Sequence, residues 1–457
     1  MNKAQPNSMQ ARDIAYLLHP QTNAALHAEI GPTLVTRAKG LRVYDGDREY
    51  IDAVAGLWNA SLGFANERLA RVAYDQMKKL GFYHLFRGRT NEPSIELCER
   101  LIQMAPVPMS KVMLQSSGSE ANDTAAKFTW YYHAAIGKPE KKKIIGRRMG
   151  YHGSTCIAAS MSGRPDMHAE FGLPLPGFLH TEFPHYYRFH NEGESEEQFS
   201  SRMASALEEL ILKEGPETIG AFIAEPVIGA GGSVMPPKSY FSKIQAVLKK
   251  YDILFIVDEV ICGFGRTGKM WGCQTYDLEP DMISCAKALS GGFQPISALL
   301  INEKVYQALV SQSAKLGNLS HGFTYSGHPV AAAVALETLR IYEETDILGH
   351  VNSVTPYLEE ALHSLADHPL VGDVRSVGLI AGVELVASKA TRQSFDPKLQ
   401  VGAVVANRAM EHGLIVRTIG DTIAIAPSLT VTKDEIEDIS GRFARALDEA
   451  YRQIARA

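Results

Sequence analysis

The stretch ILFIVDEV, residues 253–260, points to the fold class because it reads as a short apolar strand that ends in a carboxylate. A strand that is apolar on both faces is typical of a parallel sheet covered by helices on both sides. Asp258 then lies at the carboxyl end of a strand, the edge where open α/β sheets bind their ligands. On this segment alone, Asp258 could also be a solvent-exposed acid with no role in ligand binding.

A second stretch, MISCAK at residues 282–287, ends in a lysine. Because the carboxyl ends of parallel strands meet at one edge of the sheet, we expect Lys287 and Asp258 to converge. A lysine enclosed in such a cleft loses its proton more easily than a surface lysine and can form a Schiff base with a carbonyl compound. Without that enclosure, Lys287 would be an ordinary surface residue.

Short apolar strands alternate with helical patterns around these two stretches. The expected strands cover residues 111–114, 143–145, 220–223, 253–257, 282–285 and 296–301, and the helices between them include 120–135, 197–213 and 240–250. This alternation predicts an α/β fold, with a large domain whose mainly parallel sheet is flanked by helices.

The two ends of the chain have a different pattern. Three β-rich runs at residues 33–37, 41–44 and 50–53 suggest a small antiparallel unit, and residues 331–457 mix long helices with short strands. We therefore expect a smaller α+β domain formed by residues 331–457 with a contribution from residues 1–70. Residues 71–330 would form the large domain.

Composition narrows the choice of partners and of compartment. The 457 residues include 46 basic and 51 acidic side chains, a net charge of −5, with no block of like charges that would mark a nucleic-acid interface. The five cysteines form no paired motif, and no 18 apolar residues occur in succession. These features favour a cytoplasmic protein with no nucleic-acid or membrane partner.

The segment QSSGSEAN, residues 115–122, lies between an expected strand and an expected helix. Ser117 and Glu120 have the spacing of a capping box, and Gly118 would let backbone N–H groups turn toward an anion at the helix N-terminus. The segment fits a phosphate site and, equally well, simple helix capping.

Two further segments have plainer interpretations. GFGRTG at residues 263–268 trails its strand and opens no clear amphipathic helix, so we interpret it as a glycine-rich loop. PHYYRFH at residues 184–190 has no cysteine or carboxylate at ligand spacing. We expect a surface loop there and no metal site in the protein.

The combined motifs resemble the class III pyridoxal-phosphate aminotransferases, the ω-aminotransferase family, and above all its amine:pyruvate members. The resemblance runs from about Leu17 to the C-terminus. It rests on SGSEAN (117–122), GYHG (150–153), AEP (224–226), DEV (258–260), GFGRTG (263–268), Lys287 and HGFT (321–324). It implies an aspartate-aminotransferase-like fold (PLP fold type I) and pyridoxal 5′-phosphate as cofactor.

The resemblance also implies roles for single residues. Lys287 would form the Schiff base and move the substrate proton, and Asp258 would keep the pyridine nitrogen protonated. Further cofactor-binding positions are Ser117, Gly118 and Ser119 at the phosphate, Tyr151 and Val260 on the two ring faces, Glu225, and Phe323 and Thr324 from the partner subunit. The partner's contribution implies a homodimer with shared sites, with pairing into a tetramer left open.

Substrate choice depends on further positions of the same family. Trp58 and Phe86 match residues that wall the substrate pocket, together with Tyr151, and Arg417 matches the arginine that binds the carboxylate of pyruvate or alanine. GABA and ornithine aminotransferases carry a glutamate where this chain has Ala230. The resemblance therefore favours an ω-amine or ω-amino acid as donor and pyruvate as acceptor.

The orientation of Arg87 and the outcome of the reaction stay open at this point. Arg87 stands where amine-specific relatives commonly have an aromatic residue. If it points into the pocket, it would bind the acidic group of β-alanine or taurine. If it points outward, it would have no part in substrate binding. The same motifs would also suit an aminomutase or racemase reaction on this cofactor, or a non-catalytic protein that retains the fold. Lys287 and Asp258 together argue against a mere scaffold.

Overall fold

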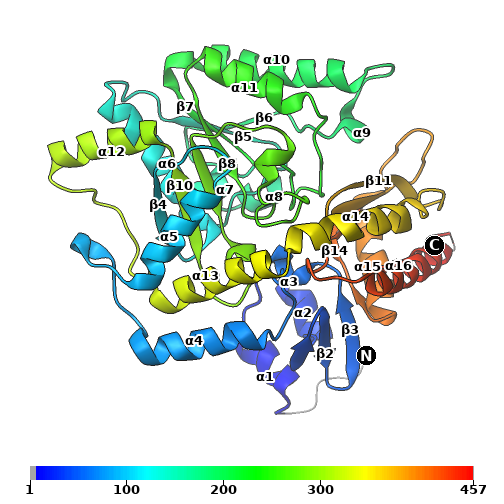
Figure 1. Ribbon diagram of the computed structural model, residues 1–457. Coiled ribbons are helices and arrows are strands. Elements are labelled where there is room, and N and C mark those ends of the chain that lie inside the picture. Colours follow the sequence, from blue (N-terminus) through cyan, green and yellow to red (C-terminus); the bar gives the residue numbers. More distant parts are fainter. Residues whose placement is uncertain (1–6, 456–457) are drawn as a thin grey trace.

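The structure, a computed structural model, describes residues 7–455 and contains three β-sheets surrounded by helices (Figure 1). The largest is a seven-stranded sheet at the centre of the molecule. In spatial order its strands are β4 (Lys111–Gln115), β10 (Ser297–Ile301), β9 (Met282–Cys285), β8 (Leu254–Asp258), β7 (Ile219–Ala224), β5 (Lys143–Arg147) and β6 (Phe178–Thr181).

The large sheet is mainly parallel, as predicted, with one exception. β6, β5, β7, β8 and β9 all pair in parallel, but β10 runs antiparallel to both β9 and β4. Only residues 286–296 connect β9 to β10, which is too short for the helical crossover that a parallel pair needs. The expected strand at residues 296–301 therefore exists, but with the opposite direction.

Helices bury both faces of this sheet. Alternate residues of β7 belong to different apolar clusters: Ile223 packs with Phe128 of α6, whereas Phe222 packs with Phe241 of α11. This explains why β7 and β8 are apolar throughout. The helices of this part are α5 (Glu92–Met104), α6 (Gly118–Ala135), α7 (Cys156–Met161), α8 (Pro165–His168), α9 (Tyr186–Phe189), α10 (Glu196–Glu214), α11 (Tyr240–Lys250), α12 (Glu303–Leu316) and α13 (Pro329–Glu344).

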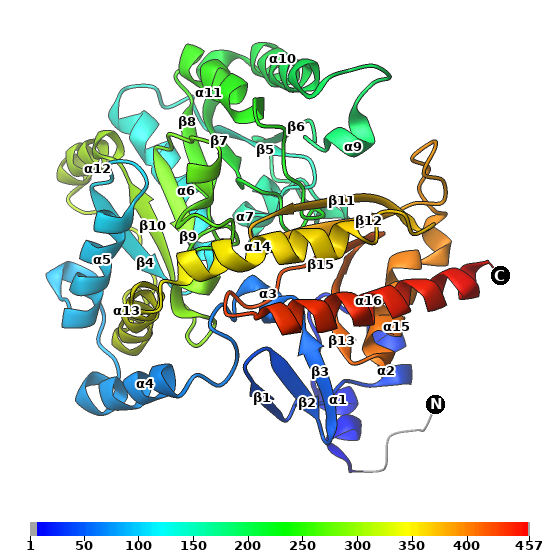
Figure 2. The same ribbon diagram turned by 45° about the vertical axis from the view of Figure 1, so that its right-hand side comes forward.

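The N- and C-terminal parts of the chain share a sheet, which places them side by side (Figure 2). Its strands are β1 (Arg37–Lys39), β2 (Arg42–Asp45), β3 (Arg48–Asp52) and β13 (Leu414–Ile415), and the first of them starts later than the predicted run at residues 33–37. A third sheet has the order β11 (Val371–Val377), β12 (Ile380–Leu385), β15 (Thr422–Ile425) and β14 (Arg417–Ile419). The domain boundaries at residues 70 and 330 stay a prediction.

The remaining helices lie in the N-terminal and C-terminal parts of the chain, before α5 or after α13. They are α1 (Met9–Tyr16), α2 (Ala24–Ile30), α3 (Ala55–Trp58), α4 (Glu67–Leu80), α14 (Ile347–His363), α15 (Val401–Glu411) and α16 (Lys433–Ile454). Within residues 7–455, no helix is both long enough and apolar enough to cross a membrane.

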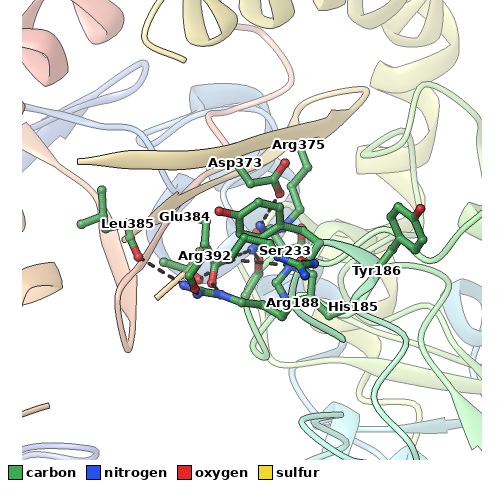
Figure 3. A network of polar contacts seen from close by, with 12 residues as sticks. His185, Tyr186, Arg188, Ser233, Asp373, Arg375, Glu384, Leu385 and Arg392 are labelled. Carbon is green, nitrogen blue, oxygen red and sulfur yellow. Dashed lines mark hydrogen bonds and ion pairs between the residues drawn. The ribbon is translucent and has the colours of Figure 1, made fainter. Parts of the chain in front are cut away.

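The segment at residues 184–190 is not the surface loop that its composition suggested. It includes α9, and its Arg188 donates from Nε to Glu384 on β12 at 2.7 Å (Figure 3). Arg375 on β11 donates to the same carboxylate at 2.7 Å and to the backbone oxygen of Ser233 at 3.0 Å. The two arginines hold the pKa of Glu384 at about 2 against the opposing effect of burial. This buried network ties the third sheet to the large sheet's loops.

Candidate active site

A cavity of about 550 Å³ opens at the carboxyl ends of β8 and β9, next to the N-terminus of α6. The sequence predicted a ligand site with Asp258 and Lys287 at this edge of the sheet, and both residues line the cavity. The other predicted site residues that line this cavity are Trp58, Gly118, Ser119, Tyr151, Glu225, Val260 and Arg417.

Lys287 lies two residues beyond the end of β9 and opens a short 3-10 helix, Lys287–Ser290. Its φ is 48°, a left-handed conformation that is uncommon outside glycine and that concentrates at functional sites. Loss of hydration lowers the pKa of its amine to about 8, although the nearby charges of Asp258 and Glu225 oppose this shift. A larger fraction of the amine is therefore uncharged near neutral pH than in an ordinary lysine, which favours its action as a nucleophile.

Asp258 is buried and receives three hydrogen bonds. Its Oδ2 atom lies 2.8 Å from His152 Nδ1 and accepts from Asn122 Nδ2 at 2.8 Å, while Oδ1 accepts from the Val260 N–H at 3.0 Å. Sequence reasoning missed His152 and Asn122 as site residues, although both lie inside motifs that it quoted. These contacts fix the carboxylate in one orientation.

The N-terminus of α6 points toward the cavity. Ser117 caps this helix by accepting from the Glu120 N–H at 3.2 Å, which confirms helix capping, but the Glu120 carboxylate accepts from the Ser116 N–H and does not complete the expected capping box. Gly118 and Ser119 line the cavity. A Cβ atom on Gly118 would lie 3.0 Å from Val260 Cγ2. Glycine therefore keeps this approach open, and the helix N-terminus can receive an anion.

Glu225 directly follows β7 at the carboxyl edge of the sheet and also lines the cavity. Its carboxylate accepts from the backbone N–H of Tyr151 at 3.0 Å and from that of Gly229 at 3.0 Å. Burial raises the pKa of this carboxyl. Glu225 thus holds Tyr151 and the loop that carries Ala230, and both residues line the cavity.

Trp58 and Arg417 also line the cavity. The Arg417 guanidinium carbon lies 4.9 Å from the centre of the Trp58 ring, and Lys287 Nζ lies 5.5 Å from it. Trp58 has a φ of 58°, in a strained turn where the Asp52 carboxylate accepts from two backbone N–H groups. The Trp58 ring thus lies close to both basic side chains.

Four predicted site residues lie elsewhere in the chain. Phe86 and Arg87 line a second cavity of about 260 Å³, together with Gly322, so the structure does not bring them to Lys287 of the same chain. A Cβ atom on Gly322 would lie 3.2 Å from Phe86 Cζ. Phe323 and Thr324 follow directly on this glycine, so all four residues gather at one place.

A segment of the N-terminal region also reaches the cavity, which the sequence had not suggested. Pro20 and Gln21 line it. Asp13 anchors this segment, since its carboxylate lies 2.9 Å from Nε2 of both His19 and His27. The three side chains satisfy one another by hydrogen bonding.

Known proteins similar to this chain agree on its family. A family model described as Aminotransferase class-III matches residues 24–447. "Gamma aminobutyrate transaminase 3, chloroplastic" of Solanum lycopersicum is 48% identical over 440 residues, which are 96% of this chain and 85% of the relative. Vanillin aminotransferase of Capsicum frutescens is 46% identical over 440 residues, 96% of each chain.

Solved structures give the same result. The crystal structure of an ω-transaminase from Pseudomonas jessenii in complex with PMP is 52% identical and has a TM-score of 0.97, over 98% of this chain and 99% of that one. The fold is therefore that of the PLP-dependent class III transaminases, fold type I. The chain belongs to the class III aminotransferases and is a pyridoxal-phosphate-dependent transaminase.

Proposed function

We propose that the protein transfers an amino group from an ω-amine or ω-amino acid to pyruvate. The observation that carries this proposal is that one cavity holds Lys287, Asp258 and Arg417. Arg417 Nε is buried without a hydrogen-bond partner within residues 7–455, so its guanidinium is available to a substrate carboxylate. Ala230 lines the same cavity and supplies no carboxylate that would compete for Arg417.

The donors of the cavity suit pyridoxal 5′-phosphate. The N-terminus of α6 offers N–H groups to a phosphate at Gly118 and Ser119, with Ser117 as its cap. Lys287 supplies the amine for the aldehyde, and Asp258 supplies a carboxylate for the ring nitrogen. The bound cofactor withdraws electrons from the substrate carbon that carries nitrogen, which makes its C–H bond more acidic.

We assign the remaining work to the protein's own side chains. Lys287, with its pKa near 8, would take the proton from the substrate carbon and deliver it to the C4′ carbon of the cofactor. His152 and Asn122 hold Asp258 as an oriented hydrogen-bond acceptor. Tyr151 and Val260 would cover the two faces of the cofactor ring, and Glu225 positions Tyr151 through its backbone N–H.

We also propose a homodimer in which each chain completes the other's site. In one chain Phe86, Arg87, Phe323 and Thr324 lie together but away from Lys287, which fits a contribution in trans. Their surroundings are unusually apolar for a free surface. Phe82, Tyr83 and Phe86 are exposed in the same segment, and the exposed Tyr325 ring contacts Phe82.

The use of β-alanine or taurine through Arg87 is the second donor candidate, and it requires this trans arrangement. For the location we propose the cytoplasm, because all five cysteines are free thiols, as in a reducing compartment.

The absorption spectrum of the purified protein tests the proposed function. We expect a visible band from the cofactor bound to Lys287, its loss on adding an amine donor, and its return with pyruvate but much less with 2-oxoglutarate. A band that no donor removes would favour a non-catalytic protein. Isomerisation of the substrate without a keto acid would favour an aminomutase or racemase.

A further inference from the structure

A second arginine reaches the substrate cavity. Arg164 precedes α8 and lines the same cavity as Lys287 and Arg417, and its guanidinium is mostly shielded, with 17% of the side chain exposed. The backbone before it is fixed, because a Cβ atom on Gly163 would collide with the backbone oxygen of Arg147. The position of Arg164 is therefore set by the fold of the large domain.

The Arg164 guanidinium uses three of its five N–H groups within residues 7–455. Nε and Nη2 donate to Asp166 at 3.1 and 2.7 Å, and Nη1 donates to the backbone oxygen of Ala230 at 2.6 Å. Nη1 and Nη2 each keep one further N–H group. The Ala230 bond thus ties Arg164 to the loop that closes this side of the cavity.

The pair with Asp166 is weak enough to be shared or replaced. Asp166 is 55% exposed, so water competes with Arg164 for its carboxylate and weakens the ion pair. A carboxylate inside the cavity meets less water, so its pair with an arginine is stronger. Arg164 can therefore turn part of its hydrogen bonding toward a ligand.

The charge balance of the cavity also favours a second anion. Arg417 has a lowered pKa, first because it is buried and then because the positive charge of Arg164 is near. Two adjacent cations repel one another until an anion lies between or beside them. Asp166 offsets part of this positive charge, and a second acidic group of the ligand can take its place where Arg164 turns toward the cavity.

We propose that Arg164 forms a second anion subsite, which binds the distal carboxylate or sulfonate of a substrate whose other end reaches Lys287 or Arg417. The inference rests on the proposed function and makes it more specific, since it favours ω-amino acids among the donors. It also differs from the assignment of a distal-acid role to Arg87, which lines another cavity of the same chain.

Equilibrium binding to the holoenzyme tests the subsite without turnover. Succinate, glutarate and adipate are compared by calorimetry with butyrate, pentanoate and hexanoate, which have the same lengths but a single carboxylate. For at least one length we expect the dicarboxylate to bind about tenfold more tightly, and Arg164→Gln to abolish this preference. Equal binding of both series to the wild type, or a preference that survives Arg164→Gln, would overturn the subsite.

Asp166→Asn is the matched variant, and we expect it to raise the preference for dicarboxylates that Arg164→Gln abolishes. Removing this carboxylate frees Nε and Nη2 of Arg164, so the preference for dicarboxylates should rise severalfold. This variant keeps the test decisive if Arg164→Gln fails to fold because the bond to Ala230 is lost. An unchanged preference in Asp166→Asn would then refute the subsite.

Kinetics connects the subsite with the donor. The informative quantity is the ratio of kcat/KM for 4-aminobutyrate to that for butylamine, which differ only in the distal carboxylate. Arg164→Gln should lower the ratio about 10- to 100-fold, and Arg164→Lys by less. An unchanged ratio contradicts the subsite, whereas absence of turnover with every donor contradicts the proposed function instead.

Discussion

His152 Nδ1 lies 2.8 Å from Asp258 Oδ2, and both side chains are buried. The Asn122 amide donates to the same oxygen, so one carboxylate oxygen is held twice by side chains. Such contacts act on the reaction only through Asp258, which makes His152 and Asn122 positioning residues. Their effect should be visible in the rate of proton removal.

We expect His152→Ala to slow the first half-reaction about 10- to 100-fold, because a hydrogen bond to a charged group contributes about 1.5–3 kcal/mol. Asp258→Asn removes the charge itself and should slow the same step by several orders of magnitude. Single-turnover rates at full cofactor occupancy measure both. A normal rate in either variant would contradict the role given to that residue.

The pKa of Lys287 predicts how the apoenzyme captures its cofactor. Only the uncharged amine attacks the aldehyde, and burial lowers the pKa of this amine to about 8. The capture rate, followed by the visible absorption band, should therefore rise with pH and level off above about 8. A rate that keeps rising toward pH 10 would place an ordinary lysine there. Lys287→Ala should show no capture band and no turnover.

Glu259, next to Asp258, predicts a pH dependence of stability. It is fully buried and accepts from the backbone N–H groups of Gly272 and Cys273, and burial raises its pKa to about 7. Between about pH 4.5 and 7 the folded state holds a proton that the unfolded state has released. This contribution to stability is complete below about pH 4.5 and is lost as the pH rises through 7.

The rise in the pKa of Glu259 from 4.5 to about 7 corresponds to about 3 kcal/mol in the free energy of unfolding. Glu259→Gln does not titrate, so the stability of the wild type relative to this variant should fall between pH 4.5 and 7.5. Melting temperatures of both proteins across this range measure the difference. A constant difference would mean that Glu259 is ionised throughout.

The sequence predicted the parts of the fold that depend on local pattern. Apolar runs such as residues 253–257 favour buried strands, because they are short, rich in β-branched residues and alternate with helical patterns. Strand direction depends on the connection, and nothing in the run at residues 296–301 itself reveals that β10 is antiparallel. Likewise, His185 gave no sign of burial, because the partners of its segment lie on strands almost 200 residues away.

The candidate site shows the same division. Asp258 and Lys287 end apolar strands, so their convergence followed from topology. Arg164 follows no strand and belongs to no recognisable motif, and only the folded chain brings it beside Arg417. Phe86 and Arg87 are the opposite case. The sequence assigned them to the substrate pocket, but in one chain they line a cavity other than the one that holds Lys287.

Arg417 should discriminate between acidic and neutral substrates. We expect Arg417→Ala to weaken pyruvate and alanine about 10- to 100-fold in kcat/KM, since it removes a charge-assisted pair. A neutral amine such as 1-phenylethylamine should lose much less in its own half-reaction. Stopped-flow measurement of the two half-reactions separates these effects, and an equal loss for both substrates would remove Arg417 from the carboxylate role.

Shared active sites predict that two inactive variants rescue each other. Lys287→Ala removes the amine but keeps the segment at residues 321–324, whereas Thr324→Glu keeps the amine but places a negative charge against the cofactor phosphate of the other chain. Each homodimer should be nearly inactive. Random reassembly of equal amounts makes half of the dimers mixed, and each mixed dimer contains one fully wild-type site.

Activity after co-refolding should therefore return to about a quarter of the wild-type value, because each heterodimer has one intact site of two. Arg87 can be tested in the same way: in a mixed dimer, Arg87→Ala should affect β-alanine or taurine only when it lies on the chain opposite the intact Lys287. No recovery above the two parent variants would mean that each chain builds its own site. In that case Phe86 and Arg87 would have no part in substrate binding.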